Sequence, residues 1–297
     1  MRPAPTSPFH HRLLRTLASG LSCVLAASGC QSIAFGIANA GVPKSPRIAE
    51  TTVMLDPARQ LSLDVYRPAS ANANALPVPV VVFFYGGSWR NGQRAQYRFV
   101  GRRLAQQGML AIVADYRTAP AVVFPGFVED AAGAVAWARR HAGEYGGDPA
   151  RVHLAGHSAG AHIAALIGTD ARYLASHGLK PRDLAGVIGM SGPYDFEIAG
   201  YEDVFGPPAA WPRTQPVAFV DGDEPPFLLI HGTGDTVVEP ADSRLLAERL
   251  RAAGGSAELR WLPEAGHLAP LATMHSPDRE PALLPAIRAF VGIADKD

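Results

Sequence analysis

Residues 151–160, with the sequence RVHLAGHSAG, constrain the fold more than any other stretch of this chain. An apolar run leads into Gly156-His157-Ser158-Ala159-Gly160, and an alanine-rich run follows it. This order predicts a buried strand, a sharp Gly-x-Ser-x-Gly turn and a helix, with the serine hydroxyl projecting from the corner. A side chain in place of either glycine would crowd the turn. The alternative is that Ser158 only caps the following helix.

Strand and helix patterns alternate along the rest of the chain. Continuously apolar runs predict strands covered on both faces, and apolar residues at helical spacing lie between them. This alternation predicts an α/β fold with a mostly parallel sheet and helices on both faces. Residues 51–55 and 61–66 flank a turn and predict antiparallel strands at the N-terminal edge. The other expected strands lie at 78–84, 109–114, 184–190, 227–230 and 258–262, and helices are expected at 98–107, 128–138, 246–253 and 283–290. We assign residues 47–297 to one domain.

Residues 194–226 interrupt this alternation. They are rich in proline and aromatic residues and show no clear period. A long irregular insertion in a compact domain is more often functional than idle. We expect it to cover the site as a lid or wall, with aromatic side chains that either line a pocket or pack against the core.

Charge and composition exclude several classes of protein. The formal net charge is +0, which argues against a nucleic-acid binder held by a basic face. The ten histidines show no zinc-ligand spacing, and both cysteines, Cys23 and Cys30, lie near the start. A disulfide framework for the body of the protein is therefore excluded, and no metal or other cofactor is expected.

The first 40 residues resemble an export signal. Three arginines within the first 15 residues precede an apolar run at 17–27, as in the charged and apolar regions of such signals. The run is too short to span a membrane, which takes roughly 20 apolar residues. We therefore predict a protein of the bacterial cell envelope, either lipid-anchored or periplasmic or secreted.

Two cleavage positions compete in this leader. Residues 27–30 (ASGC) resemble a bacterial lipoprotein box, although Ala27 stands where leucine is usual, and cleavage there would leave Cys30 as the lipidated first residue. Residues 38–40 (ANA) fit the small-x-small site of ordinary secretion, with Gly41 as the new start. Residues 41–47 then form a linker. Contact with a membrane is expected only through the N-terminal lipid anchor.

Two further polar residues follow neighbouring strands of the predicted sheet. Asp235 comes after strand 227–230 and His267 after strand 258–262. Because ligands of open parallel sheets bind at the carboxyl ends of strands, we expect both on the same rim as Ser158. A serine needs a base within hydrogen-bond reach and an acid that orients the base. The order Ser, Asp, His is the one found with this turn.

Rival residues remain for two of these roles. For the base they are His231, which we expect to brace the Asp235 loop, and His275, which we expect in a solvated loop. For the acid they are Glu239 and Asp195. Three more residues are assigned away from catalysis. We expect His157 and His162 to flank the nucleophile, with His157 pointing away from the hydroxyl, and Asp115 to brace structure.

Taken together, the motifs resemble the α/β-hydrolase superfamily, over a region from about Gln60 to the carboxyl end. They are most similar to its esterase/lipase branch, the carboxylesterases related to hormone-sensitive lipase and to feruloyl and isoprenylcysteine methyl esterases. The motifs are Tyr85-Gly86-Gly87-Ser88-Trp89, Gly147-Asp148-Pro149, Gly156-His157-Ser158-Ala159-Gly160, Asp235 and Gly266-His267.

The resemblance implies roles for the matching residues. Ser158 would be the nucleophile, His267 the general base and then acid, and Asp235 the residue that fixes the imidazole tautomer. Backbone N–H groups of Gly87, Ser88 and Ala159 would form the oxyanion hole.

The loop departs from the family at two positions, because Tyr85 replaces the usual histidine and Ser88 the usual third glycine. A tyrosine hydroxyl can supply the bracing hydrogen bond, and Ser88 retains an N–H group.

The expected activity is hydrolysis of small-molecule carboxylic esters through an acyl-enzyme, without a cofactor. A formamidase, lactonase or peptidase would use the same three residues. A non-catalytic binding protein on this fold would be marked by a broken triad, and this chain has all three residues.

Overall fold

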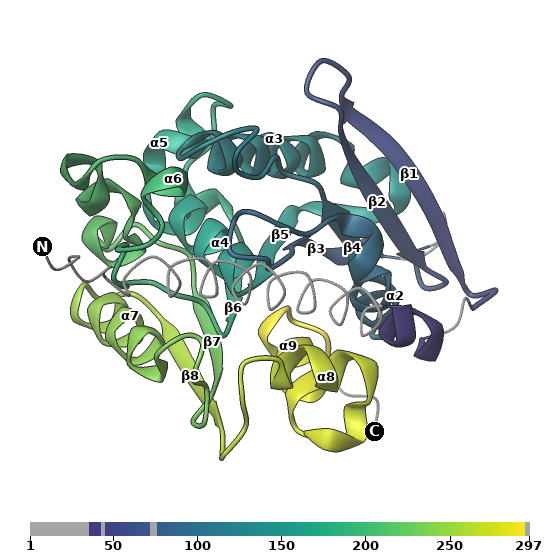
Figure 1. The fold of residues 1–297 in the computed structure, drawn as a ribbon. Coiled ribbons are helices and arrows are strands. Elements are labelled where there is room, and N and C mark those ends of the chain that lie inside the picture. The colour runs from purple at the N-terminus through teal and green to yellow at the C-terminus, as the bar shows by residue number, and fades with distance from the viewer. Residues whose placement is uncertain (1–35, 43–44, 72–75, 295–297) are drawn as a thin grey trace, which may run out of the picture.

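One eight-stranded sheet forms the centre of the molecule in a computed structural model that describes residues 36–42, 45–71 and 76–294 (Figure 1). Its spatial order is β1-β2-β4-β3-β5-β6-β7-β8. β1 pairs antiparallel with β2, and β2 antiparallel with β4, while all other pairs are parallel. This confirms the predicted fold class. The strands are β1 Ile48–Asp56, β2 Leu61–Pro68, β3 Val78–Phe84, β4 Leu110–Ala114, β5 Gly147–His157, β6 Gly186–Met190, β7 Phe227–Gly232 and β8 Ala257–Leu262.

The central strands are buried along their whole length. Every residue of β3, β4, β6 and β7 is buried, as continuous apolar runs in a sheet covered on both faces require. The edge strand β1 instead exposes most of its residues. In the parallel pair β3–β5, Phe84 lies opposite Gly156, so these two strands end side by side.

Helices cover both faces of the sheet. α2 contacts α8, and α8 contacts α9, so these three helices group on one face of the sheet (Figure 1). α3 packs against α4. α4 also contacts β5 and β6, and α7 contacts β7 and β8. The described α-helices of seven or more residues are α2 Arg98–Gln106, α3 Gly126–His141, α4 Ala159–Thr169, α7 Pro240–Ala252, α8 Ala269–His275 and α9 Leu283–Phe290.

Several short elements were not predicted from the sequence. α5 (Ala171–Ala175) and α8 are only five and seven residues long, too short to show a helical period. The region 194–226 contains α6 (Glu202–Phe205) and two 3₁₀ helices, Pro208–Thr214 and Pro216–Phe219. Among the described residues no helix is long and apolar enough to cross a membrane. Of the predicted export signal, the basic region, the apolar run at 17–27 and Cys30 lie outside the described residues, whereas residues 36–40 are described.

His153, in the middle of β5, makes the stability of the sheet depend on pH. Burial lowers the pKa of His153 to about 4, and hydrogen bonds from its ring to the carbonyls of Arg151 and Val80 offset this only in part. The unfolded chain therefore binds the proton first, at a pKa near 6.5, and stability is lost as pH falls below that value.

Between pH 7.5 and 5.0 the free energy of unfolding should fall in both the unmodified chain and His153→Gln. We predict that the fall is about 2 kcal/mol smaller in His153→Gln, because it lacks the titrating imidazole. Urea denaturation at a series of pH values measures the difference. Parallel pH profiles for the two proteins would contradict it.

Candidate active site

Ser158 occupies a strained turn between β5 and α4. Its backbone has φ 55° and ψ −123°, a conformation that non-glycine residues rarely adopt. The N–H of Ser158 donates to the carbonyl of Met190 at 2.9 Å, which ties the turn to the end of β6. A methyl group on Gly156 would overlap the carbonyl of Gly160, and one on Gly160 would overlap that of Phe84. Both glycines are therefore required by close backbone packing, as the sequence predicted.

Asp235 and His267 are joined by a hydrogen bond between the ends of β7 and β8. The distance from His267 Nδ1 to Asp235 Oδ2 is 2.8 Å. Because an ionised carboxylate only accepts, Nδ1 carries the proton and Nε2 presents its lone pair. The other carboxylate oxygen accepts from the N–H groups of Val237 and Val238, at 2.8 and 3.0 Å. The pair can thus hold the imidazole in the tautomer that accepts a proton.

The charge on Asp235 is preserved although the side chain is buried. Burial raises the pKa of this carboxyl, but hydrogen bonds from Val238, His267 and Val237 outweigh that effect, and its pKa lies below the usual value. His231 also donates to Asp235 Oδ2, at 3.1 Å, and its Nδ1 accepts from the Ser243 hydroxyl at 2.7 Å. Burial lowers the pKa of His231. The bracing role predicted for His231 is thereby confirmed.

Ser158 and His267 lie on the wall of one cavity of about 740 Å³. The hydroxyl of Ser158 forms no hydrogen bond with His267 within the described part of the chain. Such contacts are often long until substrate binds. Other wall residues come from the loop after β3, from α2 and from α8, including Gly87, Ser88, Phe99, Leu271 and His275.

The loop after β3 is held open by three successive residues with positive φ: Gly87 at 138°, Ser88 at 53° and Trp89 at 57°. Tyr85 braces the start of this loop, as predicted for its hydroxyl. Tyr85 donates to the carbonyl of Tyr116 at 3.1 Å, and Tyr116 donates back to the carbonyl of Tyr85 at 2.7 Å. The N–H groups of Gly87 and Ser88 are therefore carried by a loop that is braced at its start and lies at the edge of the cavity.

The first N–H groups of α4 lie next to the same turn. The N–H groups of Ala161 and His162 donate to the carbonyl of Ser158, at 2.9 and 3.1 Å. The N–H groups of Ala159 and Gly160 are therefore the ones that have no partner inside the helix. Ala159, the first residue of α4, is buried.

The rival residues are also placed. Asp195 and Glu239 are both exposed, and Asp115 forms an ion pair with Arg94 at 2.6 Å, the bracing role predicted for it. His275 was predicted to lie in a solvated loop, and this is wrong. It ends α8, is half-buried and lines the cavity. The sequence showed no helical period for α8, because its seven residues make just under two turns.

His157, which the sequence indicated would point away from the hydroxyl, packs against His267. The two rings are 4.8 Å apart, and His157 Nε2 donates to the backbone carbonyl of His267 at 3.0 Å. Burial lowers the pKa of His157 to about 3, so the ring stays neutral. Its Nδ1 has no hydrogen-bond partner among the described residues. His157 thus holds the main chain of His267 without adding charge.

Three aromatic residues of 194–226 pack around Trp89. Phe196 stacks on it at 5.4 Å, and Phe205 and Tyr201 meet it edge-on at 4.7 and 5.6 Å. The Trp89 indole donates to His162 Nδ1 at 3.2 Å, and His162 Nε2 donates to the carbonyl of Thr214. These contacts hold Trp89, and with it the loop after β3, through residues that do not line the cavity. No residue of 194–226 is among those that line the cavity beside Ser158, and its role as a lid stays a prediction.

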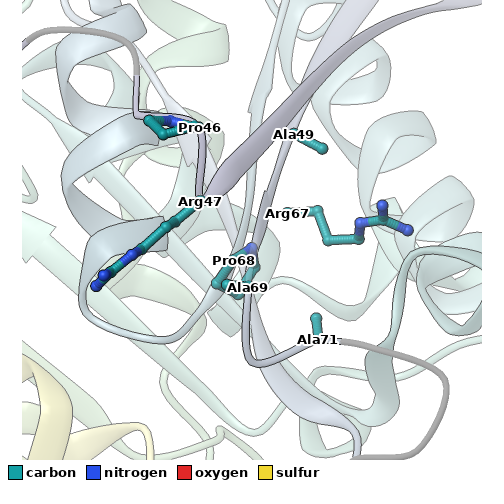
Figure 2. Close-up of a pocket in the computed structure, with 7 residues that line it drawn as sticks. All are labelled: Pro46, Arg47, Ala49, Arg67, Pro68, Ala69 and Ala71. Atoms are coloured by element: carbon teal, nitrogen blue, oxygen red, sulfur yellow. The ribbon is translucent and has the colours of Figure 1, made fainter.

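A second cavity, of about 340 Å³, lies beside the β1–β2 hairpin. Figure 2 shows its two arginines, Arg47 and Arg67, pointing in opposite directions. They do not converge on a common ligand. Within residues 36–42, 45–71 and 76–294 no three His, Cys, Asp or Glu side chains come together as metal ligands.

Comparison with known proteins places these features in context. The BD-FAE family model matches residues 63–250. Esterase LipC of Mycobacterium tuberculosis (strain ATCC 25618 / H37Rv) is 34% identical over 234 residues, which cover 71% of this chain and 57% of LipC. Esterase LipQ of the same organism is 29% identical over 255 residues, covering 79% of this chain and 60% of LipQ. The chain thus spans under two thirds of the length of these relatives.

A solved esterase structure superposes on this chain over a larger share of both chains than these sequence matches cover. The thermophilic esterase Est2 of Thermogutta terrifontis, with propionate bound, superposes with a TM-score of 0.70 at 27% identity. The match covers 86% of this chain and 98% of Est2.

The packing at Gly160 generates a prediction about stability. Gly160→Ala would push a methyl group into the backbone carbonyls of Phe84 and Tyr85, which cannot rotate away. We expect a loss of about 1–3 kcal/mol in the free energy of unfolding, measured by urea denaturation. Gly133→Ala in α3 is the matched control, because a methyl group there meets nothing within 4 Å. It should stabilise the helix by about 0.5–1 kcal/mol. Equal effects at both positions would contradict the proposed packing.

Proposed function

We propose that this chain hydrolyses small-molecule carboxylic esters. The premise is that the chain belongs to the BD-FAE family, in the esterase branch of the α/β-hydrolases. The observation that carries the proposal is the hydrogen bond between Asp235 and His267 Nδ1. It leaves Nε2 as a proton acceptor on the wall of the cavity that Ser158 also lines.

In the proposed reaction, Ser158 Oγ attacks the ester carbonyl carbon while His267 Nε2 takes the hydroxyl proton. The resulting imidazolium is stabilised by the Asp235 carboxylate. It then gives the proton to the leaving alcohol as the carbon–oxygen bond breaks. Water, activated by the same imidazole, attacks the acyl-enzyme and releases the acid.

Negative charge develops on the former carbonyl oxygen in each tetrahedral intermediate. We assign its stabilisation to the backbone N–H groups of Gly87, Ser88 and Ala159. One such donor is typically worth ~10²–10³ in rate. The loop that carries Gly87 and Ser88 is held by the pair of hydrogen bonds between Tyr85 and Tyr116 and by the aromatic packing on Trp89.

The class of acyl group is proposed from the ligands of one solved relative. Structures of Thermogutta Est2 contain propionate or butyrate, and we propose that acyl groups of this kind also enter the cavity beside Ser158. We further propose that the N-terminal leader directs export to the bacterial cell envelope, with the mature protein lipid-anchored, periplasmic or secreted.

The nucleophile can be tested with a fluorophosphonate probe, because Thermogutta Est2 is also solved phosphonylated by cyclosarin. We expect the chain to be labelled stoichiometrically, and Ser158→Ala to abolish both labelling and ester hydrolysis. Ser191→Ala is the matched control, since Ser191 is a buried serine at the end of β6 whose hydroxyl has no partner among the described residues. It should keep both. Labelling that survives in Ser158→Ala would refute the assignment.

The acid can be tested by Asp235→Asn. An amide in place of the carboxylate can donate to Nδ1 and favour the wrong tautomer, so we expect kcat to fall by about 10⁴. Glu239→Gln changes the exposed rival carboxylate and should leave kcat within about twofold. Steady-state kinetics with 4-nitrophenyl butyrate compare the two. Similar losses in both variants, or a loss only in Glu239→Gln, would reassign the acid.

A further inference from the structure

Residues 36–42, here named the N-terminal strap, are attached to the domain by the side chain of Asn39. The strap is helical over 36–41. Asn39 Oδ1 accepts from the N–H of Phe99 at 3.0 Å, and Asn39 Nδ2 donates to the carbonyl of Ala95 at 2.9 Å. Phe99 is the second residue of α2, whose own N-cap residue, Tyr97, makes no side-chain cap. Asn39 therefore caps α2 from a distant part of the chain.

Further contacts fix both sides of the strap. His275, at the end of α8, donates from Nδ1 to the carbonyl of Ala38 at 3.2 Å. The buried Arg102 of α2 donates to the carbonyl of Val42 at 2.9 Å, and Val42 is itself buried. Gly41 lies so close to His275 that a methyl group there would overlap the imidazole ring. The expectation that residues 41–47 form a linker is therefore wrong at Gly41, which is helical, and at Val42, which is buried.

The strap also forms part of the cavity that Ser158 and His267 line. Ile37 and Ala38 lie on its wall together with Leu268 and Leu271. Ile37 is 64% exposed and Leu268 60% exposed, although both are large apolar side chains. Two exposed apolar residues on the wall of one cavity form a surface that an apolar ligand can cover.

We propose that the mature protein retains residues 36–42, and that Ile37 determines specificity for esters whose apolar group extends from Ser158 to this wall. Cleavage after Ala40 would remove Ile37 and Ala38 from the cavity. It would also leave the N–H of Phe99 and the ring of His275 without these partners. Of the two cleavage positions, only the one at Cys30 keeps the strap. The specificity role rests on the proposed function, whereas retention of the strap does not.

The specificity role is tested with the full chain on 4-nitrophenyl acetate and 4-nitrophenyl octanoate. We expect the ratio of kcat/KM for octanoate over acetate to fall roughly tenfold in Ile37→Ser, the low end for one lost apolar contact. Leu76→Ser is the matched control, because Leu76 is 89% exposed and does not line the cavity, and its ratio should not change. An unchanged ratio in Ile37→Ser, or the same fall in Leu76→Ser, would overturn the role of Ile37. Failure of the unmodified chain to hydrolyse either ester would instead contradict the proposed function.

Retention of the strap is tested separately by the intact mass of the exported protein, expressed in a bacterium with its own N-terminus. We expect a mature chain that begins at or before residue 36, as cleavage at Cys30 would produce. A mature chain that begins at Gly41 would overturn this part of the proposal, whatever the kinetics show.

Discussion

The close approach of two backbones at the turn around Ser158 is the constraint on which the site depends. Gly160 lacks a Cβ, so α4 packs directly against the carbonyls of Phe84 and Tyr85 at the end of β3. β3 and β5 are paired in parallel, and the loop after β3 therefore begins beside the turn after β5. This geometry brings the backbone N–H groups of that loop and of the start of α4 to one edge of the sheet. The proposed oxyanion hole follows from two chain segments that touch without intervening side chains.

Hydrogen-bond partners and burial give the three histidines near Asp235 different properties. The Nε2 atoms of His157 and His231 donate to oxygen atoms, at 3.0 Å to the His267 carbonyl and 3.1 Å to Asp235. Burial lowers the pKa of both rings, so neither carries a positive charge beside the carboxylate. His267 donates from Nδ1 instead, which leaves its Nε2 to accept a proton on the wall of the cavity that Ser158 lines. Because the rings of His157 and His231 are neutral, they do not compete with the attraction between Asp235 and the His267 imidazolium that the proposed reaction forms.

The N-terminal strap and α8, which are far apart in the chain, meet at the cavity, whereas residues 194–226 do not line it. The N-terminal strap contributes Ile37 and α8 contributes Leu271 to the same wall, and His275 connects the two elements. Phe196, Tyr201 and Phe205 instead pack around Trp89, on the loop that carries Gly87 and Ser88. The strap and α8 thus contribute to the cavity wall, and aromatic residues from another part of the chain pack against the loop after β3.

The sequence by itself determined the α/β class, most of the strands and the turn at Ser158, because long apolar runs and required glycines are local signals. It also placed Asp235 and His267 after neighbouring strands, and the structure brings them within 2.8 Å. Only the tertiary structure decided the short helix α8, the place of His157 against His267, and the docking of residues 36–42 on α2. These features depend on contacts between residues far apart in the chain, such as the 60 positions from Asn39 to Phe99. Periodicity and spacing report on neighbours in the sequence, whereas the walls of this cavity are built from neighbours in space.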